Sequence, residues 1–234
     1  MGRLPVCLCV VAVLLAGCRG SDRESRDDDA RSLGGEVVGS TASATSTSER
    51  PRVVFLGDSL TAGYGLAKEQ SVPSLIQKRL DDEGYNYEVV NHGVSGDTSA
   101  GGVSRLEWAL TGDVRVLVLE LGANDGLRGV PVESMKSNLS TIIDGARKRG
   151  VRVLLTGMEA PPNHGALYTA EFRRVFSELA REHDVAFIPF YLEGVAGNPA
   201  LNISDGIHPN PEGTAIVERT IWRALEPLLE KSAQ

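Results

Sequence analysis

Cysteine is nearly missing from this chain of 234 residues, because Cys7, Cys9 and Cys18 all lie within the first eighteen positions. The sequence that follows can therefore form neither an internal disulfide nor a cysteine metal site. Basic stretches are missing as well: 24 Lys and Arg residues stand against 31 Asp and Glu residues, and no segment gathers the basic ones into a stripe. We therefore expect no nucleic-acid partner.

Histidine is also scarce, with four residues, and no two of them stand at a ligand spacing such as H-E-x-x-H. We therefore expect no metal and no other cofactor. Three of the four receive no catalytic role. His183 closes a predicted helix, His92 precedes a glycine turn, and His164 at most contacts a substrate. No obligate protein partner is inferred.

A long hydrophobic run is the third missing feature. Arg3 precedes an apolar stretch over residues 4–15, which is shorter than the ~20 residues that a transmembrane helix needs. This arrangement is typical of a signal peptide. The stretch ends in "LLAGC", which resembles a bacterial lipobox, the motif whose cysteine is acylated after cleavage just before it. We expect residues 1–17 to be a lipoprotein signal peptide and Cys18 to be the lipidation site.

A plain secretory signal with an incidental cysteine is the alternative, but the segment lacks an A-x-A-like cleavage pattern. From Cys18 to residue 50 the chain is polar, as in "SDRESRDDDAR" and "GSTASATSTSER". Such a composition cannot offset its ordering entropy, so residues 18–50 are expected to be a disordered tether. The predicted location is the extracytoplasmic face of a bacterial membrane. Arg19 gives no aspartate-type retention signal, which favours the outer membrane on the periplasmic side.

After residue 50, short apolar runs alternate with amphipathic segments of helical length. The runs are rich in Val and Leu rather than alternating, as expected for parallel strands covered on both faces. We expect one domain over residues 51–234 in the α/β class: a three-layer α/β/α sandwich around a flavodoxin-like, five-stranded parallel sheet. The predicted strands are 52–56, 87–90, 114–121, 151–157 and 185–190, and the predicted helices are 72–82, 99–110, 132–149, 168–183 and 211–229.

Polar residues follow four of the predicted strands. In such sheets the ligand site lies outside the carboxyl ends of the strands, so these loops should meet at one edge. Ser59 follows the first strand, Gly96 the second, and Asn124 the third, while Asp205 and His208 lie three residues apart before the last helix.

These residue types suit acyl transfer. A serine hydroxyl needs an adjacent base, and an imidazole oriented by a carboxylate supplies one. The N–H groups of Ser59 and Gly96 and the amide of Asn124 could stabilise an oxyanion. Taken singly, each residue is ordinary turn or surface composition. Their occurrence together, in this order and each at a predicted strand end, favours a catalytic site.

Four short blocks carry a family resemblance: "GDSL" at 57–60, the glycine of "SGDTS" at 96, "GAND" at 122–125 and "DGIHP" at 205–209. They resemble the conserved blocks of the SGNH (GDSL) hydrolases. The longer strings "GDSLTAGYG" and "NHGVSGDTSAGG" look like the TesA-like subgroup, esterases also described as thioesterase I, arylesterase and lysophospholipase L1. The similarity extends over most of residues 52–230.

By position, the resemblance makes Ser59 the nucleophile, His208 the base and Asp205 its orienting carboxylate, with Ser59, Gly96 and Asn124 as oxyanion donors. It also implies that "NDGLRGVP" is a mobile loop that closes over the acyl chain. Two segments depart from the family: Ala123 replaces a frequent glycine, and residues 160–165 differ from the usual rim of the pocket.

The expected function is a lipid-anchored serine esterase that hydrolyses acyl and aryl esters such as lysophospholipids, with thioesters as a further class, through an acyl-enzyme. Two alternatives stay open. One is a carbohydrate O-acetylesterase, since other SGNH branches deacetylate glycans. The other is a surface lipoprotein that binds acyl chains without turning them over.

Overall fold

A computed structural model describes residues 50–231 of the chain. The predicted signal peptide, Cys18 and the predicted tether up to residue 49 lie outside the described residues. Within the described part, no helix has both the length and the apolar character that crossing a membrane requires.

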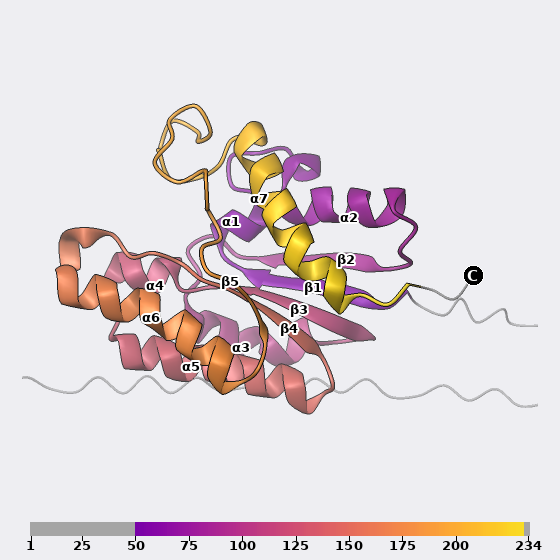
Figure 1. The fold of residues 1–234 in the computed structure, drawn as a ribbon, viewed down its shortest axis with the longest axis horizontal. Coiled ribbons are helices and arrows are strands. Elements are labelled where there is room, and N and C mark those ends of the chain that lie inside the picture. Colours follow the sequence, from indigo (N-terminus) through magenta and orange to yellow (C-terminus); the bar gives the residue numbers. More distant parts are fainter. Residues whose placement is uncertain (1–49, 232–234) are drawn as a thin grey trace, which may run out of the picture. The chain divides into compact units, whose positions relative to one another are not determined.

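A five-stranded sheet forms the centre of the folded region (Figure 1). All of its pairings are parallel, and the strand order is β2-β1-β3-β4-β5. The chain therefore runs from β1 outward to β2 and then crosses to β3 on the other side of β1, which places a topological switch point at β1 and β3. The strands are β1 (Arg52–Gly57), β2 (Glu88–Gly93), β3 (Val114–Glu120), β4 (Arg152–Thr156) and β5 (Ala186–Ile188).

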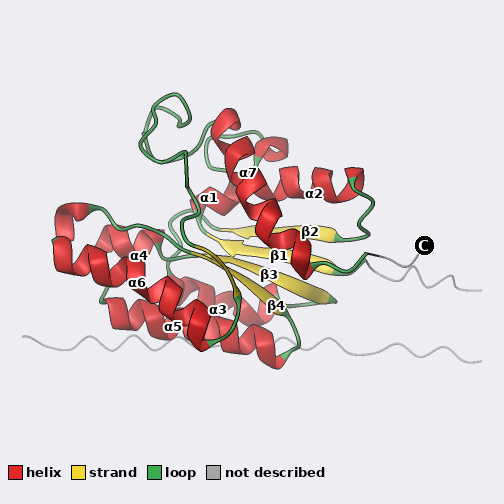
Figure 2. Ribbon diagram, in the orientation of Figure 1, coloured by secondary structure: helices red, strands yellow, loops and turns green. Residues whose placement is uncertain are grey.

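Helices cover both faces of this sheet, as Figures 1 and 2 show. One face carries α2 (Val72–Asp82) and α7 (Pro211–Leu225). The other carries α3 (Ser99–Ala109), α5 (Val132–Lys148) and α6 (Ala166–Glu182). The predicted three-layer α/β/α sandwich with a five-stranded parallel sheet is confirmed.

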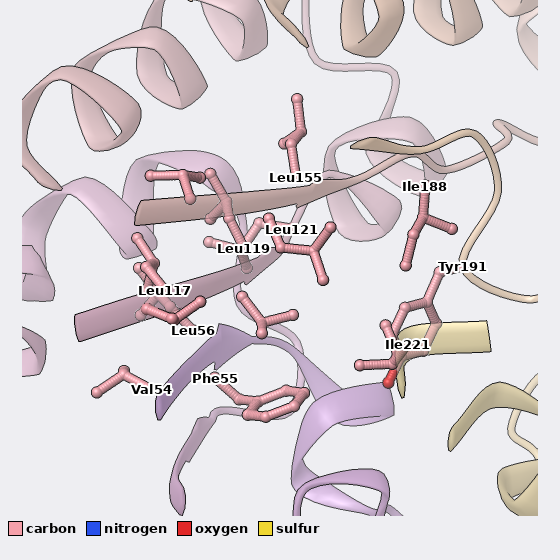
Figure 3. Close-up of a cluster of buried hydrophobic side chains, with 14 of the residues drawn as sticks. Val54, Phe55, Leu56, Leu117, Leu119, Leu121, Leu155, Ile188, Tyr191 and Ile221 are labelled. Atoms are coloured by element: carbon pink, nitrogen blue, oxygen red, sulfur yellow. The ribbon is translucent and has the colours of Figure 1, made fainter. Parts of the chain in front are cut away.

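The core lies in the central strands, where the sequence is a continuous apolar run. In β1, Val53, Val54, Phe55 and Leu56 are all buried, and residues 116–119 of β3 are fully buried. Because helices cover both faces of the sheet, alternate side chains find no solvent on either side. Figure 3 shows this packing, with Leu117 of β3 beside Leu56 of β1.

Some boundaries differ from the prediction. Strand β2 continues to Gly93 rather than ending at residue 90. The last helix stops at Leu225 and is followed by a 3₁₀ turn, Glu226–Leu228, because Pro227 has no N–H for a helical hydrogen bond. Two short helices, α1 (Ser59–Ala62) and α4 (Ala123–Arg128), were not predicted. Two further 3₁₀ turns span Lys68–Gln70 and Pro162–His164.

Candidate active site

The turn after β1 presents Ser59 at the carboxyl edge of the sheet. Asp58 caps α1, because its Oδ1 accepts the N–H of Leu60 at 3.0 Å, and Ser59 is the first residue of that helix. A Cβ at Gly57 would lie 2.0 Å from the Oγ1 of Thr61. Only glycine therefore lets the chain turn this tightly into the helix.

The loop between β5 and α7 supplies the imidazole and the carboxylate. It folds back on itself, since the N–H of Ile203 donates to the carbonyl of His208 at 2.8 Å. Asp205 Oδ1 accepts the N–H groups of Ile207 and His208 at 2.9 and 3.0 Å. Its other oxygen, Oδ2, lies 2.6 Å from His208 Nδ1. The short spacing in sequence thus becomes a closed turn that aims the carboxylate at the ring.

The fold joins these groups to Ser59, 149 positions earlier in the chain: Ser59 Oγ lies 2.8 Å from His208 Nε2. Hydrogen bonds from the N–H groups of His208 and Ile207 lower the pKa of Asp205 to about 2. The Asp205 carboxylate is therefore ionised at neutral pH and holds a proton on Nδ1, which leaves the Nε2 lone pair for the serine hydroxyl.

An aromatic ring flanks the imidazole on the solvent side. The ring of Tyr64 lies 4.6 Å from that of His208, centroid to centroid, at an interplanar angle of 41°. Tyr64 is about half exposed. No role was predicted for Tyr64, although it belongs to the block "GDSLTAGYG" that contains Ser59. Its contact restricts the ring rotations available to His208.

A cavity of about 240 Å³ opens beside Ser59 and His208. Gly96 and Asn124 line it, so the structure brings both predicted oxyanion donors to the serine. Gly96 has φ +82° and lies in the loop after β2, whereas Asn124 lies in α4 rather than in the predicted loop. The apolar lining comes from Leu60, Tyr64, Ala123, Leu127 and Ile207.

Arg105 of α3 ties the loops of this site together. Its guanidinium donates to the carbonyls of Gly57 and His92 at 2.8 and 2.6 Å, and to Asp97 Oδ2 at 2.7 Å. It thereby fixes the ends of β1 and β2 relative to the loop that carries Gly96. Arg105 was not predicted, because a single arginine within an amphipathic helix gives no signal of such contacts.

The remaining histidines have other partners. His92 is the next-to-last residue of β2, and its ring is tilted by 49° against that of Trp108, with 4.1 Å between the ring centroids. His164 has its Nε2 3.3 Å from the carbonyl of Leu127, behind the cavity wall. Within residues 50–231, no group of three or more His, Cys, Asp or Glu side chains is placed to hold a metal.

His183, which closes α6 as predicted, belongs to a second Ser–His–Asp chain. Its Nε2 lies 3.0 Å from Ser140 Oγ, and its Nδ1 lies 3.2 Å from Asp144 Oδ1. Ser140 and Asp144 stand one turn apart within α5, where the main-chain N–H groups are committed to the helix. The main chain around Ser140 therefore offers no N–H group to an oxyanion. Ser140 and Asp144 can accordingly serve as matched controls for Ser59 and Asp205.

A hydrogen-bonded serine, imidazole and carboxylate at the carboxyl edge of a parallel sheet define a serine hydrolase on a three-layer α/β/α fold. Comparison with known proteins agrees. The chain belongs to the GDSL-like Lipase/Acylhydrolase family, which it matches over residues 55–216.

Similar proteins agree in both sequence and fold. Esterase TesA of Pseudomonas aeruginosa is 44% identical over 178 residues, which cover 76% of this chain and 89% of the relative. The thioesterase 1/protease 1/lysophospholipase L1 of Escherichia coli strain K12 is 34% identical over 178 residues, covering 76% and 84%. A crystal structure of TesA superposes with a TM-score of 0.73 at 43% identity, covering 76% of this chain and 99% of that one.

The SGNH (GDSL) membership and the TesA-like kinship predicted from the sequence are therefore confirmed, as is the class of activity. The chain is a carboxylic ester hydrolase of the GDSL type. The lipoprotein signal peptide stays a prediction.

Proposed function

We propose that this esterase cleaves acyl esters through an acyl-enzyme, with Ser59 as nucleophile, His208 as general base and Asp205 as the carboxylate that orients it. One observation carries the proposal: the 2.8 Å contact between Ser59 Oγ and His208 Nε2 borders a cavity with an apolar lining. An acyl chain can occupy that cavity while its carbonyl carbon lies next to the hydroxyl.

In the first half-reaction, Ser59 Oγ attacks the carbonyl carbon as its proton passes to His208 Nε2. The carbonyl oxygen becomes an oxyanion and accepts hydrogen bonds from the N–H groups of Ser59 and Gly96 and from the Asn124 amide. The tetrahedral intermediate then collapses. The C–O bond to the leaving alcohol breaks, and Nε2–H gives its proton to that oxygen.

In the second half-reaction, a water molecule takes the position of the leaving alcohol. His208 removes its proton, and the resulting hydroxide adds to the acyl carbon. Collapse of this second intermediate releases the carboxylic acid and returns the proton to Ser59 Oγ. Asp205 stays ionised throughout and stabilises the imidazolium that forms twice in each turnover.

Lysophospholipids and related acyl esters are the proposed natural substrates, with thioesters cleaved as well. Support comes from the apolar lining of the cavity by Leu60, Leu127 and Ile207, which suits an alkyl chain better than a sugar ring. The E. coli relative carries both thioesterase and lysophospholipase in its name. A carbohydrate O-acetylesterase would need polar groups around a glycan beside a very small acyl pocket.

A series of p-nitrophenyl esters from acetate to laurate tests this proposal. For esters that acylate the enzyme faster than water deacylates it, we expect a burst of p-nitrophenol close to the enzyme concentration, because the alcohol leaves before water attacks. We also expect kcat/KM to rise beyond acetate, since each buried methylene contributes about 0.8 kcal/mol. A strict preference for acetate would favour the deacetylase. Binding without turnover would favour the acyl-binding lipoprotein.

We also propose that the enzyme works at an extracytoplasmic membrane surface, held by acylated Cys18 and the tether of residues 18–50. The "LLAGC" string supports this, because anchor and lysophospholipid would then share one surface. Cells fed a labelled fatty acid should label the wild-type protein, and Cys18→Ser should lose both the label and recovery in the membrane fraction. Equal recovery of both proteins in membranes, without label, would contradict the anchor.

A further inference from the structure

A fully buried carboxyl group lies directly behind the nucleophile turn. Glu120, the last residue of β3, has no exposed surface. Its Oε2 accepts the N–H of Asp58 at 3.2 Å and the hydroxyl of Thr61 at 2.8 Å. Its Oε1 is buried with no hydrogen-bond donor within the described part of the chain. The mechanism proposed above makes no use of this group.

A second buried carboxyl lies beside it. The main-chain N–H of Asp58 donates to Glu120 Oε2, which places the two carboxyl groups close together, and each affects the pKa of the other. Asp58 also accepts the N–H of Leu60 on Oδ1 and the amide of Asn124 on Oδ2, both at 3.0 Å. Asp58 therefore connects Glu120 to the proposed oxyanion donor.

The two carboxyl groups cannot both be ionised at low cost. Neither accepts a hydrogen bond from a lysine or arginine among residues 50–231. Two adjacent carboxylates in a buried site repel each other, so one of them keeps a proton. The orphaned Oε1 decides which one: an ionised Glu120 would leave this oxygen without a donor, whereas an O–H there needs only an acceptor.

Asp58 is that acceptor. Its oxygens already receive two N–H donors, so the negative charge is compensated there. Burial, and next the charge of Asp58, raise the pKa of Glu120 well above its usual value. Burial also raises the pKa of Asp58, but hydrogen bonds from Leu60, Glu120 and Asn124 oppose that rise.

We propose that Glu120 is a neutral carboxylic acid that donates its proton to the Asp58 carboxylate and thereby holds the Asn124 amide in the oxyanion site. The proposal rests on the proposed function for the role of Asn124. Glu120 is a positioning residue, since it lies behind the nucleophile turn and does not line the substrate cavity.

The groups around the pair are consistent with this charge state. From α1 the neighbour of Glu120 is the neutral hydroxyl of Thr61. From the segment after β5 it is Tyr191, which lies among core side chains (Figure 3). Burial and the two carboxyl groups raise the pKa of Tyr191 well above 10, so it adds no charge. His208 lies close enough to Asp58 that its imidazolium, when it forms during turnover, favours the ionised form of Asp58.

Infrared spectroscopy tests the charge state without an activity assay. At pH 8 ordinary carboxyl groups are ionised, so we expect one C=O stretching band of a protonated acid in the wild-type protein. This band should be missing from Glu120→Gln. Absence of the band in the wild-type protein would overturn the proposal, even if the variant failed to fold.

Stability gives a second readout. The pKa of Glu120 is higher in the folded than in the unfolded chain, so its contribution is fully present below about pH 4.5 and is lost as pH rises toward the folded pKa. Glutamine does not titrate. Relative to Glu120→Gln, the unfolding equilibrium constant of the wild-type protein should therefore rise about tenfold per pH unit above pH 4.5. If the unfolding equilibrium constants of the wild-type protein and of Glu120→Gln changed with pH in the same way, the proposal would be contradicted.

Kinetics test the positioning role. Asn124→Ala should lower kcat about 10²- to 10³-fold with little change in KM, as for loss of one oxyanion donor. Glu120→Ala should lower kcat by about tenfold or more, whereas Glu120→Gln keeps most of it, because its amide can donate to Asp58 as the acid does. In an Asn124→Ala background, Glu120→Ala should cost no further activity.

For each variant, the concentration of active sites is measured by titration with a fluorophosphonate, and kcat is calculated per active site. A partly unfolded sample is therefore not mistaken for one with a lower kcat. Equal losses in Glu120→Gln and Glu120→Ala, or additive losses with Asn124→Ala, would overturn the positioning role. An Asn124→Ala variant with full activity would instead contradict the proposed oxyanion site and leave the infrared result untouched.

Discussion

Replacing Ser59 with alanine is expected to lower kcat for ester hydrolysis by a factor on the order of 10⁴ to 10⁶. The variant loses the hydroxyl oxygen that lies 2.8 Å from His208 Nε2 and borders the cavity. Water would then have to attack the ester directly, without a covalent intermediate. The cavity and the oxyanion donors stay in place, so KM should change little.

Ser140→Ala is the matched control for this variant, because Ser140 makes the same kind of contact with His183. It should keep the wild-type kcat. Initial rates on a short p-nitrophenyl ester, with circular dichroism to confirm folding, decide the result. If Ser59→Ala retained a tenth or more of the wild-type kcat, Ser59 would not be the nucleophile.

Changing Asp205 to asparagine is expected to lower kcat by about 10⁴-fold, through the tautomer of the neighbouring imidazole. The asparagine carbonyl can still accept the two N–H groups that Asp205 Oδ1 accepts now, so the turn should persist. The amide nitrogen, however, would face His208 Nδ1 as a donor. The ring would then carry its proton on Nε2 and could not accept one from Ser59.

Asp144→Asn provides the control, because Asp144 faces His183 in the second Ser–His–Asp chain. We expect it to match the wild-type protein in kcat. Steady-state kinetics at pH 7 to 8 would show the difference. A loss of less than tenfold for Asp205→Asn would mean that the carboxylate does not set the tautomer of His208.

The predicted layers and sheet were correct because strands that are buried on both faces need apolar side chains at successive positions. Such strands are therefore recognisable in the sequence as continuous Val- and Leu-rich runs. Ser59, Gly96 and Asn124 come just after the ends of β1, β2 and β3, and the parallel sheet brings those ends together at one edge. Asp205 and His208 lie instead late in the long loop between β5 and α7. Asp205 and His208 were the easiest pair to place, since they lie three positions apart within one turn.

Other features had no such signature. The helices α1 and α4 have four and six residues, which is too short for a helical period to show. Arg105 and Glu120 act through contacts with residues tens of positions away, from inside an ordinary helix and an ordinary strand. Glu120 is the one acidic residue near the end of the predicted strand 114–121, where a charged side chain is expected to reach solvent, yet the sheet buries it completely.

The second Ser–His–Asp chain shows why residue types and distances are not sufficient to identify a catalytic site. Ser140, His183 and Asp144 hydrogen-bond much like the proposed triad. Ser59 differs in three respects: it begins a helix, it borders a cavity, and it has Gly96 and Asn124 beside it. Those surroundings, rather than the three side chains, are the basis of the assignment.

Covalent labelling with a fluorophosphonate, followed by peptide mass spectrometry, tests the central assignment most directly. The reagent phosphonylates a serine only where a base activates it and donors hold the phosphoryl oxygen. We predict one adduct per molecule on the peptide that contains Ser59, retained in Ser140→Ala and lost in Ser59→Ala. An adduct that persists in Ser59→Ala, or that forms on Ser140, would contradict the account.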